Sequence, residues 1–247
     1  MPPDFHDLTA RLASIYSKRL ALRPVCLSDT WPLFDATRHP AFNQHLLWDQ
    51  PRSEWEVYRR VEAIVEATRQ GKMASVSAVL KTTGAWVSLF RFQQPAGDEE
   101  GTPGSTRDNT LEMGLWTHAH YWHGRFSLEL GRMCVDAAFQ QPGVEHLIGI
   151  TSTDNRSSQQ LMQLVGLHLQ PQQVQRTGES GPPRPSMVFE VDRATWLHQR
   201  RAQTFETYED QAPTPERTVS PDSGPSPSPS WWTTPSTGPG PATNSRC

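Results

Sequence analysis

The part of this sequence best suited to chemistry is a strand that turns directly into an amphipathic helix. Residues 111–117 read as the strand, Gly124 lies in the turn, and apolar residues recur on one face of the following helix. The first N–H groups of a helix lack partners within it, and the helix dipole is positive at that end. Such a turn can hold a phosphate or diphosphate with backbone N–H groups, although a glycine before a helix is also common as a simple turn.

Three histidines in the same turn are candidates for acid–base chemistry. His118, His120 and His123 lie between the strand and the helix, and histidine titrates near neutral pH. We take His120 as the candidate proton carrier, with a solvated loop histidine as the alternative. Their spacing is not one that zinc sites use, and no thiolate or carboxylate adjoins them, so no metal is expected.

A carboxylate, Glu112, begins the same strand. Strand alternation places Glu112, Gly114 and Trp116 on one face. If that face points toward the reacting groups, Glu112 can act as a general base, directly or through water. The alternative is an exposed strand residue. Cys134 falls on the apolar face of the helix and is expected in the core rather than as a nucleophile.

The elements around this segment alternate between helical and strand periodicity, which predicts a mixed α/β fold. A Ser-x-x-Glu capping box begins the clearest helix at Ser53. The polar segment 94–109 is expected to be a long loop. The predicted strands cover residues 20–25, 73–80, 85–92, 111–117, 147–152 and 187–191, and the predicted helices cover 31–37, 54–70, 126–137 and 157–165.

Composition narrows the function classes. The 247 residues include 23 basic and 26 acidic side chains, which give a net charge of −3. The chain therefore lacks the excess of positive charge that proteins use to bind nucleic acid or an anionic membrane. Three cysteines without CxxC spacing fit a reducing cytosol. No apolar run approaches the roughly 18 residues of a membrane span. We therefore predict a cytoplasmic protein with neither nucleic acid nor membrane as a partner.

The C-terminal part differs sharply in composition from the rest. Residues 213–247 are rich in Pro, Ser, Thr and Gly, and such a stretch cannot bury enough apolar surface to offset its chain entropy. We predict an N-terminal extension over residues 1–17, one domain over 18–200 and a disordered tail over 201–247. The pair Trp231–Trp232 in the tail is either a docking peptide for a partner or an incidental sticky pair.

Taken in order, the motifs resemble the RimJ/RimL-like branch of the GNAT N-acetyltransferase superfamily over residues 18–192. The resemblance implies a mostly antiparallel, twisted sheet flanked by helices. It also implies transfer of an acetyl group from acetyl-CoA to a primary amine on a protein N-terminus or a small molecule. The matching pieces are Leu22-Arg23-Pro24, Glu112-Met113-Gly114-Leu115, Tyr121-Trp122-His123-Gly124-Arg125, Glu129, Asn155-Arg156-Ser157-Ser158 and Gly166-Leu167.

The same resemblance assigns residues to the co-substrate. Backbone groups of Leu115, Trp116 and Thr117 would bind the pantetheine arm, and Asn155 with Ser158 would hold the pantetheine or its phosphate end. Asn155 is equally suited to cap the short helix that follows it. The diphosphate would rest on the backbone of Gly124, Arg125, Phe126 and Ser127.

Two departures from the family pattern leave alternatives open. Where the family tends to have Gly-x-Gly, this chain has only Gly124, and Arg125 could compensate with charge-assisted bonds to phosphate. The last short helix has Leu161, Met162 and Leu164 where many family members place a proton-donating tyrosine. A degenerate domain that binds a CoA ester or a partner without catalysis is therefore one alternative. An interaction module that acts through its tail is the other.

The acceptor side is expected to form from residues 37–48 and the loop 94–109. Asp98, Glu99 and Glu100 in that loop could attract an ammonium group, or they could simply be solvated. The acceptor itself and the general acid are not determined by the sequence, and a homodimer stays open.

Overall fold

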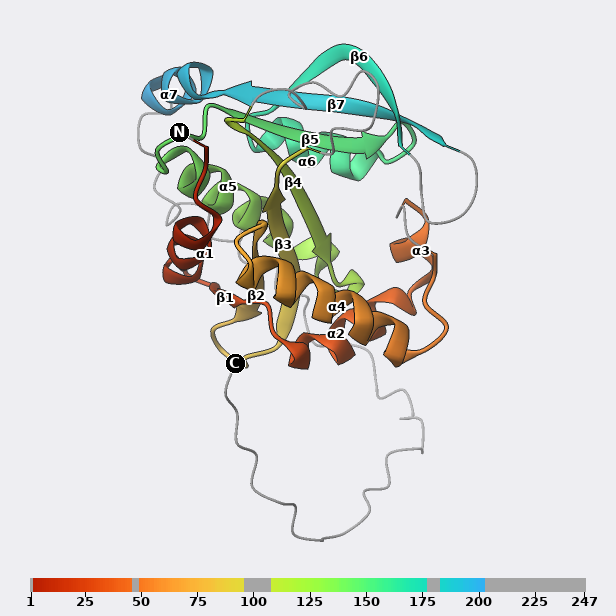
Figure 1. The fold of residues 1–247 in the computed structure, drawn as a ribbon. Helices are drawn as coiled ribbons and strands as arrows, with labels where there is room; N and C mark the ends of the chain where they lie inside the picture. The colour runs from red at the N-terminus through yellow and green to blue at the C-terminus, as the bar shows by residue number, and fades with distance from the viewer. Residues whose placement is uncertain (1, 46–48, 96–107, 177–182, 203–247) are drawn as a thin grey trace, which may run out of the picture.

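The chain folds into one twisted seven-stranded sheet with helices on both faces (Figure 1). This computed structural model describes residues 2–45, 49–95, 108–176 and 183–202. The helices are α1 (Phe5–Ser14), η1 (Leu27–Asp29), α2 (Thr30–Thr37), α3 (Pro40–Asn43), α4 (Glu54–Arg69), η2 (Ala119–Gly124), α5 (Phe126–Phe139), α6 (Arg156–Leu164) and α7 (Arg193–Ala202). The strands are β1 (Leu20–Pro24), β2 (Met73–Leu80), β3 (Trp86–Gln93), β4 (Thr110–Thr117), β5 (His146–Ser152), β6 (His168–Arg176) and β7 (Arg184–Asp192).

The strand order is β1-β2-β3-β4-β5-β7-β6, and every neighbouring pair is antiparallel except β4 and β5. The parallel pairing joins Thr110–Met113 to His146–Gly149, whereas β4 continues to Thr117 and β5 to Ser152. Beyond Met113 the two strands no longer pair. The predicted mixed, mostly antiparallel sheet is confirmed, and the end of β4 has an edge that no described strand covers.

Two hydrophobic clusters cover the two faces of the sheet. One joins α1, α5 and α6 to the sheet, and Trp196 of α7 stacks on Phe139 of α5 with ring centroids 5.2 Å apart. The other packs α2, α3 and α4 against β3, with Leu33, Val61 and Leu89 fully or almost fully buried. In Figure 1, α1 and α5 lie on one side of β3 and β4, and α2 with α4 lies on the other.

The first helix was expected only as an N-terminal extension, but it belongs to the core. Asp4 caps α1 by accepting hydrogen bonds from the N–H groups of His6 and Asp7. Phe5, Leu8 and Leu12 recur at helical spacing and are buried against the sheet. At roughly 25 cal/mol per Å² of buried apolar surface, such side chains each stabilise the fold by about 1.5–3 kcal/mol.

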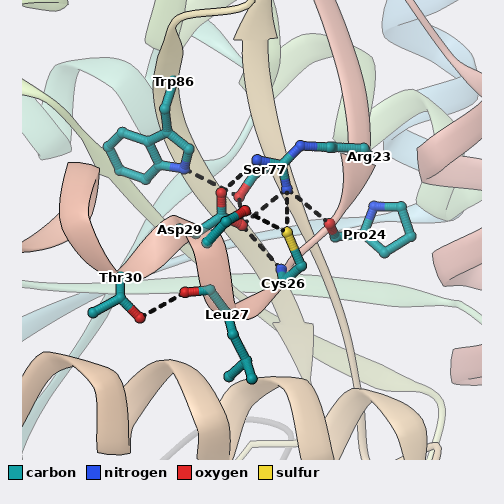
Figure 2. Close-up of polar contacts among 9 residues, drawn as sticks. Arg23, Pro24, Cys26, Leu27, Asp29, Thr30, Ser77 and Trp86 are labelled. Carbon is teal, nitrogen blue, oxygen red and sulfur yellow. Dashed lines mark hydrogen bonds and ion pairs between the residues drawn. The ribbon is translucent and has the colours of Figure 1, made fainter. Parts of the chain in front are cut away.

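A buried polar network fixes α2 to the sheet (Figure 2). Asp29 is fully buried and accepts hydrogen bonds from Arg23 Nη1 at 3.0 Å, the N–H of Cys26 at 3.0 Å and Ser77 Oγ at 2.8 Å. Ser77 Oγ in turn accepts from Trp86 Nε1 at 3.1 Å. The Leu22-Arg23-Pro24 motif therefore supplies the cation that lets a carboxylate be buried where β1 ends and α2 begins.

Strand β6 was not predicted, because its sequence has no apolar alternation. Most of its residues are exposed, and Val174 is its buried one. The backbone pairing with β7 holds β6 in the sheet, because its own side chains bury little apolar surface. Among the described helices, none has the length and apolar character to cross a bilayer. Most of the loop 94–109 and nearly all of the tail lie outside the described residues.

Candidate active site

The open edge of β4 presents backbone groups that no strand uses. The His118 N–H donates to the Val87 carbonyl across the β3–β4 ladder at 2.9 Å. Antiparallel alternation then directs the N–H and C=O of Leu115 and Thr117 away from β3, and those of Trp116 toward it. The indole N–H of Trp122 donates to the Thr117 carbonyl at 2.8 Å. Of the three predicted pantetheine residues, Leu115 has both backbone groups on the open edge, and Thr117 has its N–H there.

The predicted diphosphate segment forms the start of α5. Arg125 precedes the helix with φ of 56°, in the left-handed region, and no side chain caps the helix there. The backbone donors at the start of α5 are therefore not taken by a capping side chain, which suits an anion. A Cβ at Gly124 would lie 2.4 Å from the Phe126 ring. A side chain at position 124 would therefore force the Phe126 ring to move, whether or not a phosphate also approaches Gly124.

An arginine that the sequence analysis missed holds this turn in place. Arg19 Nε donates to Glu129 Oε2 at 2.7 Å, and its Nη1 donates to the Gly124 carbonyl at 2.9 Å. Its guanidinium also lies 4.1 Å from the centroid of the Phe126 ring. Ser17 Oγ donates to the other oxygen of Glu129. The helical glutamate of the motif therefore fastens α5 to the start of β1, which no local pattern could have shown.

A chain of hydroxyl groups links the start of α5 to the sheet. Ser88 Oγ donates to Thr117 Oγ1 at 2.8 Å, and Thr117 Oγ1 lies 2.9 Å from Ser127 Oγ. Both Ser88 and Thr117 are buried. These hydrogen bonds connect the first turn of α5 to the end of β4 and so position the backbone donors of the two segments relative to each other.

Asn155 and Ser158 are placed at the start of α6, just after β5. The Asn155 side chain accepts a hydrogen bond from the N–H of Ser158 at 3.1 Å, and Asn155 is the N-cap of the helix. The capping interpretation of Asn155 is confirmed. A second role toward pantetheine stays a prediction. Met162 of α6 packs against Gly149, where an added Cβ would meet its sulfur at 2.9 Å, so α6 approaches β5 closely.

Glu112 is buried, so the alternative of an exposed strand residue is wrong. Arg176 Nη2 of β6 donates to Glu112 Oε1 at 2.9 Å. The neighbouring Arg91 of β3 lies within electrostatic range, and burial lowers the pKa of its guanidinium while Glu112 opposes that shift. The ion pair with Arg176 stabilises the charged form of Glu112. To accept a proton, Glu112 must therefore weaken its ion pair with Arg176.

The three histidines of the turn do not gather around one point. His118 Nδ1 accepts from the His120 N–H at 3.2 Å, and His118 Nε2 lies 3.2 Å from Asp35 Oδ2 of α2. The accepting Nδ1 leaves the proton on Nε2, which faces Asp35. His120 and His123 are exposed. Within the described ranges, no group of three or more His, Cys, Asp or Glu residues could hold a metal ion.

Helix α2 and the segment that follows it reach the ends of the two central strands, β4 and β5. His118 at the end of β4 contacts Asp35, and His45 Nδ1 lies 3.3 Å from Asp154 Oδ1 and 3.5 Å from Ser152 Oγ, at the end of β5. Residues 46–48 of the predicted acceptor segment 37–48 lie outside the described residues, as do Asp98, Glu99 and Glu100. The described part of this segment borders the place where β4 and β5 separate.

Family comparison agrees with this geometry. Residues 19–168 match the family model described as "Acetyltransferase (GNAT) domain". The chain belongs to the GNAT acetyltransferase family. It is an acetyl-CoA-dependent N-acetyltransferase, with acetyl-CoA as its co-substrate. The open edge of β4 and the uncapped start of α5 suit the amide-rich arm and the diphosphate of that molecule.

Solved structures with the same fold include several acetyltransferases. A putative ribosomal-protein-serine acetyltransferase from Vibrio cholerae is 17% identical, with 78% of this chain and 99% of that chain covered and a TM-score of 0.59. Aminoglycoside acetyltransferase AAC(6')-Ib with coenzyme A is 17% identical, with coverages of 73% and 99% and a TM-score of 0.60. RimL with coenzyme A is 12% identical, with coverages of 71% and 95% and a TM-score of 0.56. A sequence search of curated proteins finds no match.

Two groups that sequence reasoning considered have no part in this geometry. Cys134 is fully buried, and burial raises the pKa of its thiol well above the ordinary value, so it is a core residue as predicted. Leu161 and Met162 pack against the core from α6, the helix on which many members of the family have a proton-donating tyrosine. The described residues of α6 therefore supply no acid for the departing thiolate.

Proposed function

We propose that this protein acetylates a primary amine by direct attack in a ternary complex with acetyl-CoA. The observation that carries the proposal is the separation of β4 from β5 after Met113, which leaves the N–H and C=O of Leu115 on an unpaired edge. A pantetheine arm contains two amides and can add to that edge as a strand would. The thioester would then lie beside β4, where an amine can reach it.

The reaction needs three changes at the thioester. The amine nitrogen attacks the carbonyl carbon, the C–S bond breaks, and the amine loses a proton while the thiolate gains one. No covalent nucleophile on the protein is required, in agreement with the buried thiol of Cys134. We propose Glu112 as the group that takes the amine proton, directly or through water, while it shares Arg176. His120 is the second candidate proton carrier, because it is exposed and near the turn.

The acceptor would be a protein N-terminus or a small-molecule amine. RimL is described as an alpha-N-protein acetyltransferase of a ribosomal protein, and AAC(6')-Ib has been solved with kanamycin. Both acceptor types are therefore compatible with this fold. The segment around α3 and the start of β7, which meet where Arg184 donates to the Gln44 carbonyl at 3.3 Å, would border the acceptor.

A titration and a turnover assay together test this proposal. Melting temperature is followed with increasing acetyl-CoA, and release of free CoA thiol is followed with a panel of amines. We expect a saturable rise in melting temperature and thiol release that depends on the amine. A saturable rise without amine-dependent thiol release would instead indicate a domain that binds the CoA ester without catalysis. No rise at all would contradict the proposed site.

A further inference from the structure

A guanidinium lies across β4 at the residue where this strand leaves β5. Arg91 of β3 faces Gly114 in the antiparallel register, and Gly114 directly follows Met113, the last residue paired with β5. A Cβ at Gly114 would lie 3.1 Å from Arg91 Nε, so the missing side chain gives the arginine room to cross the strand. Its guanidinium lies 4.8 Å from the centroid of the Trp116 ring.

Arg91 has no anionic partner of its own among the described residues. The nearest carboxylate, Glu112, forms its ion pair with Arg176 instead, at 2.9 Å, and acts on Arg91 only through its charge. Burial lowers the pKa of Arg91, and the second guanidinium lowers it further. A guanidinium has five N–H donors, and those of Arg91 can bind an acceptor group on a ligand.

Two guanidinium groups and one carboxylate lie close together here among the residues that the structure describes. Arg91 and Arg176 contribute two guanidinium groups, and Glu112 contributes one carboxylate. The uncharged ring of Trp116 provides a flat apolar surface next to the Arg91 guanidinium. A ligand carboxylate would give Arg91 an anionic partner, because its two oxygens match the fork of a guanidinium.

We propose that Arg91 recognises a carboxylate that the acceptor carries a few atoms from its reactive amine. The inference rests on the proposed function, because the cluster lies beside Leu115, where the thioester and the amine would meet. The positive field has a second effect, since it disfavours the ammonium form and so favours the neutral amine that attacks. Acceptors of this kind are free amino acids or peptide N-termini with an acidic residue next to the terminal one. Polycationic amines are repelled.

Matched acceptor pairs test this proposal. Alanine is compared with alaninamide, and the peptide Ser-Asp-Ala-Ala-amide with Ser-Asn-Ala-Ala-amide, while kanamycin serves as a polycation. For each, kcat/KM is measured by thiol release, and binding to the CoA complex by the shift in melting temperature. We expect one carboxylate member to exceed its amide partner by about tenfold or more, the range of a charge-assisted hydrogen bond. The pair that shows the preference identifies the source of the carboxylate.

Variants show whether Arg91 causes the preference. In Arg91→Met the carboxylate and amide members should become equivalent, mainly through KM, and Arg91→Lys should keep part of the preference. Arg59→Gln removes an exposed guanidinium from α4 and should leave the preference unchanged. If Arg91→Met does not melt cooperatively, the proposal is still tested by Arg91→Lys and by the carboxylate and amide acceptor pairs measured with the wild-type protein. Equal use of both members, or a preference for kanamycin, overturns the proposal. Loss of acetyl-CoA binding or of all acetyl transfer would instead contradict the proposed function.

Discussion

The proposed co-substrate side and the proposed acceptor side of this molecule are built in different ways. The proposed co-substrate side consists largely of one continuous segment, from Leu115 on β4 to Ser127 on α5, and it would offer mainly backbone groups. The proposed acceptor side brings together side chains from β3, β4 and β6, namely Arg91, Glu112 and Arg176. Backbone recognition tolerates a varied sequence, whereas side-chain recognition sets which acceptor fits. The experiments below test that division of labour, beginning with the largest expected effect.

The largest effect is expected at Asp29, which anchors the helices of the acceptor side. Asp29→Ala leaves Arg23 next to a buried site without its carboxylate, and breaking a buried pair in this way costs about 3–5 kcal/mol. Denaturant unfolding at neutral pH should show that loss in the free energy of unfolding. Asp29→Asn keeps the shape and should cost less. A loss below about 1 kcal/mol for the alanine variant would show that the network contributes little.

The next effect concerns Glu112. Glu112→Gln should lower kcat by about 100-fold, the lower range for general base catalysis, with little change in acetyl-CoA affinity, and should shift the acidic limb of the pH–rate profile. Arg176→Gln is the matched control, because it breaks the same ion pair and keeps the carboxylate. If both variants lose activity equally, Glu112 acts by positioning. Wild-type turnover of Glu112→Gln between about pH 6 and 9 would exclude it as the base.

Variants at Gly124 distinguish two reasons for a glycine in the turn before α5: packing against the Phe126 ring and close approach of the diphosphate. Gly124→Ala places a methyl group against the Phe126 ring and should weaken acetyl-CoA binding by about tenfold as the turn shifts. The double variant Gly124→Ala/Phe126→Ala removes the clash. Recovery of affinity in the double variant, measured by calorimetry, would assign the glycine to packing. Continued loss would assign it to close approach of the diphosphate.

A smaller effect is expected at Asn155, whose two roles can be separated. Asn155→Ala should cost about 1 kcal/mol of stability, because it removes the cap of α6. Asn155→Ser restores a capping oxygen but shortens the side chain. If Asn155 also contacts pantetheine, the serine variant should melt like the wild type and yet bind acetyl-CoA more weakly. Unchanged affinity in both variants would leave capping as its only role.

No effect is expected from the tail. Removing residues 213–247 should preserve cooperative melting and acetyl-CoA affinity, since the composition of that segment cannot build a core. Limited proteolysis should cleave this segment first. Loss of cooperative melting after truncation near Gln211 would contradict the predicted domain boundary.

The same division explains what could be predicted from the sequence. Strands β2 to β5 and helices α2, α4, α5 and α6 follow from periodicity and caps, because each buries one apolar face. Strand β6 could not be found, since its side chains are polar and its order comes from β7. Within the site, the β4–α5 segment is contiguous and therefore recognisable. The partners Arg19, Arg91 and Arg176 are brought to it by long-range strand pairing, and no local pattern marks them.

The short parallel contact between β4 and β5 has a mechanical consequence. Four residue pairs, from Thr110–His146 to Met113–Gly149, are the direct strand contact between the β1–β4 half and the β5–β7 half of the sheet. Each half is otherwise held by longer antiparallel ladders. The seam is thus the shortest strand pairing between neighbouring strands of the sheet, and it is where a hinge between the two halves would lie. A pantetheine arm lying along β4 would occupy that hinge, so the co-substrate would also act as a brace between the two halves.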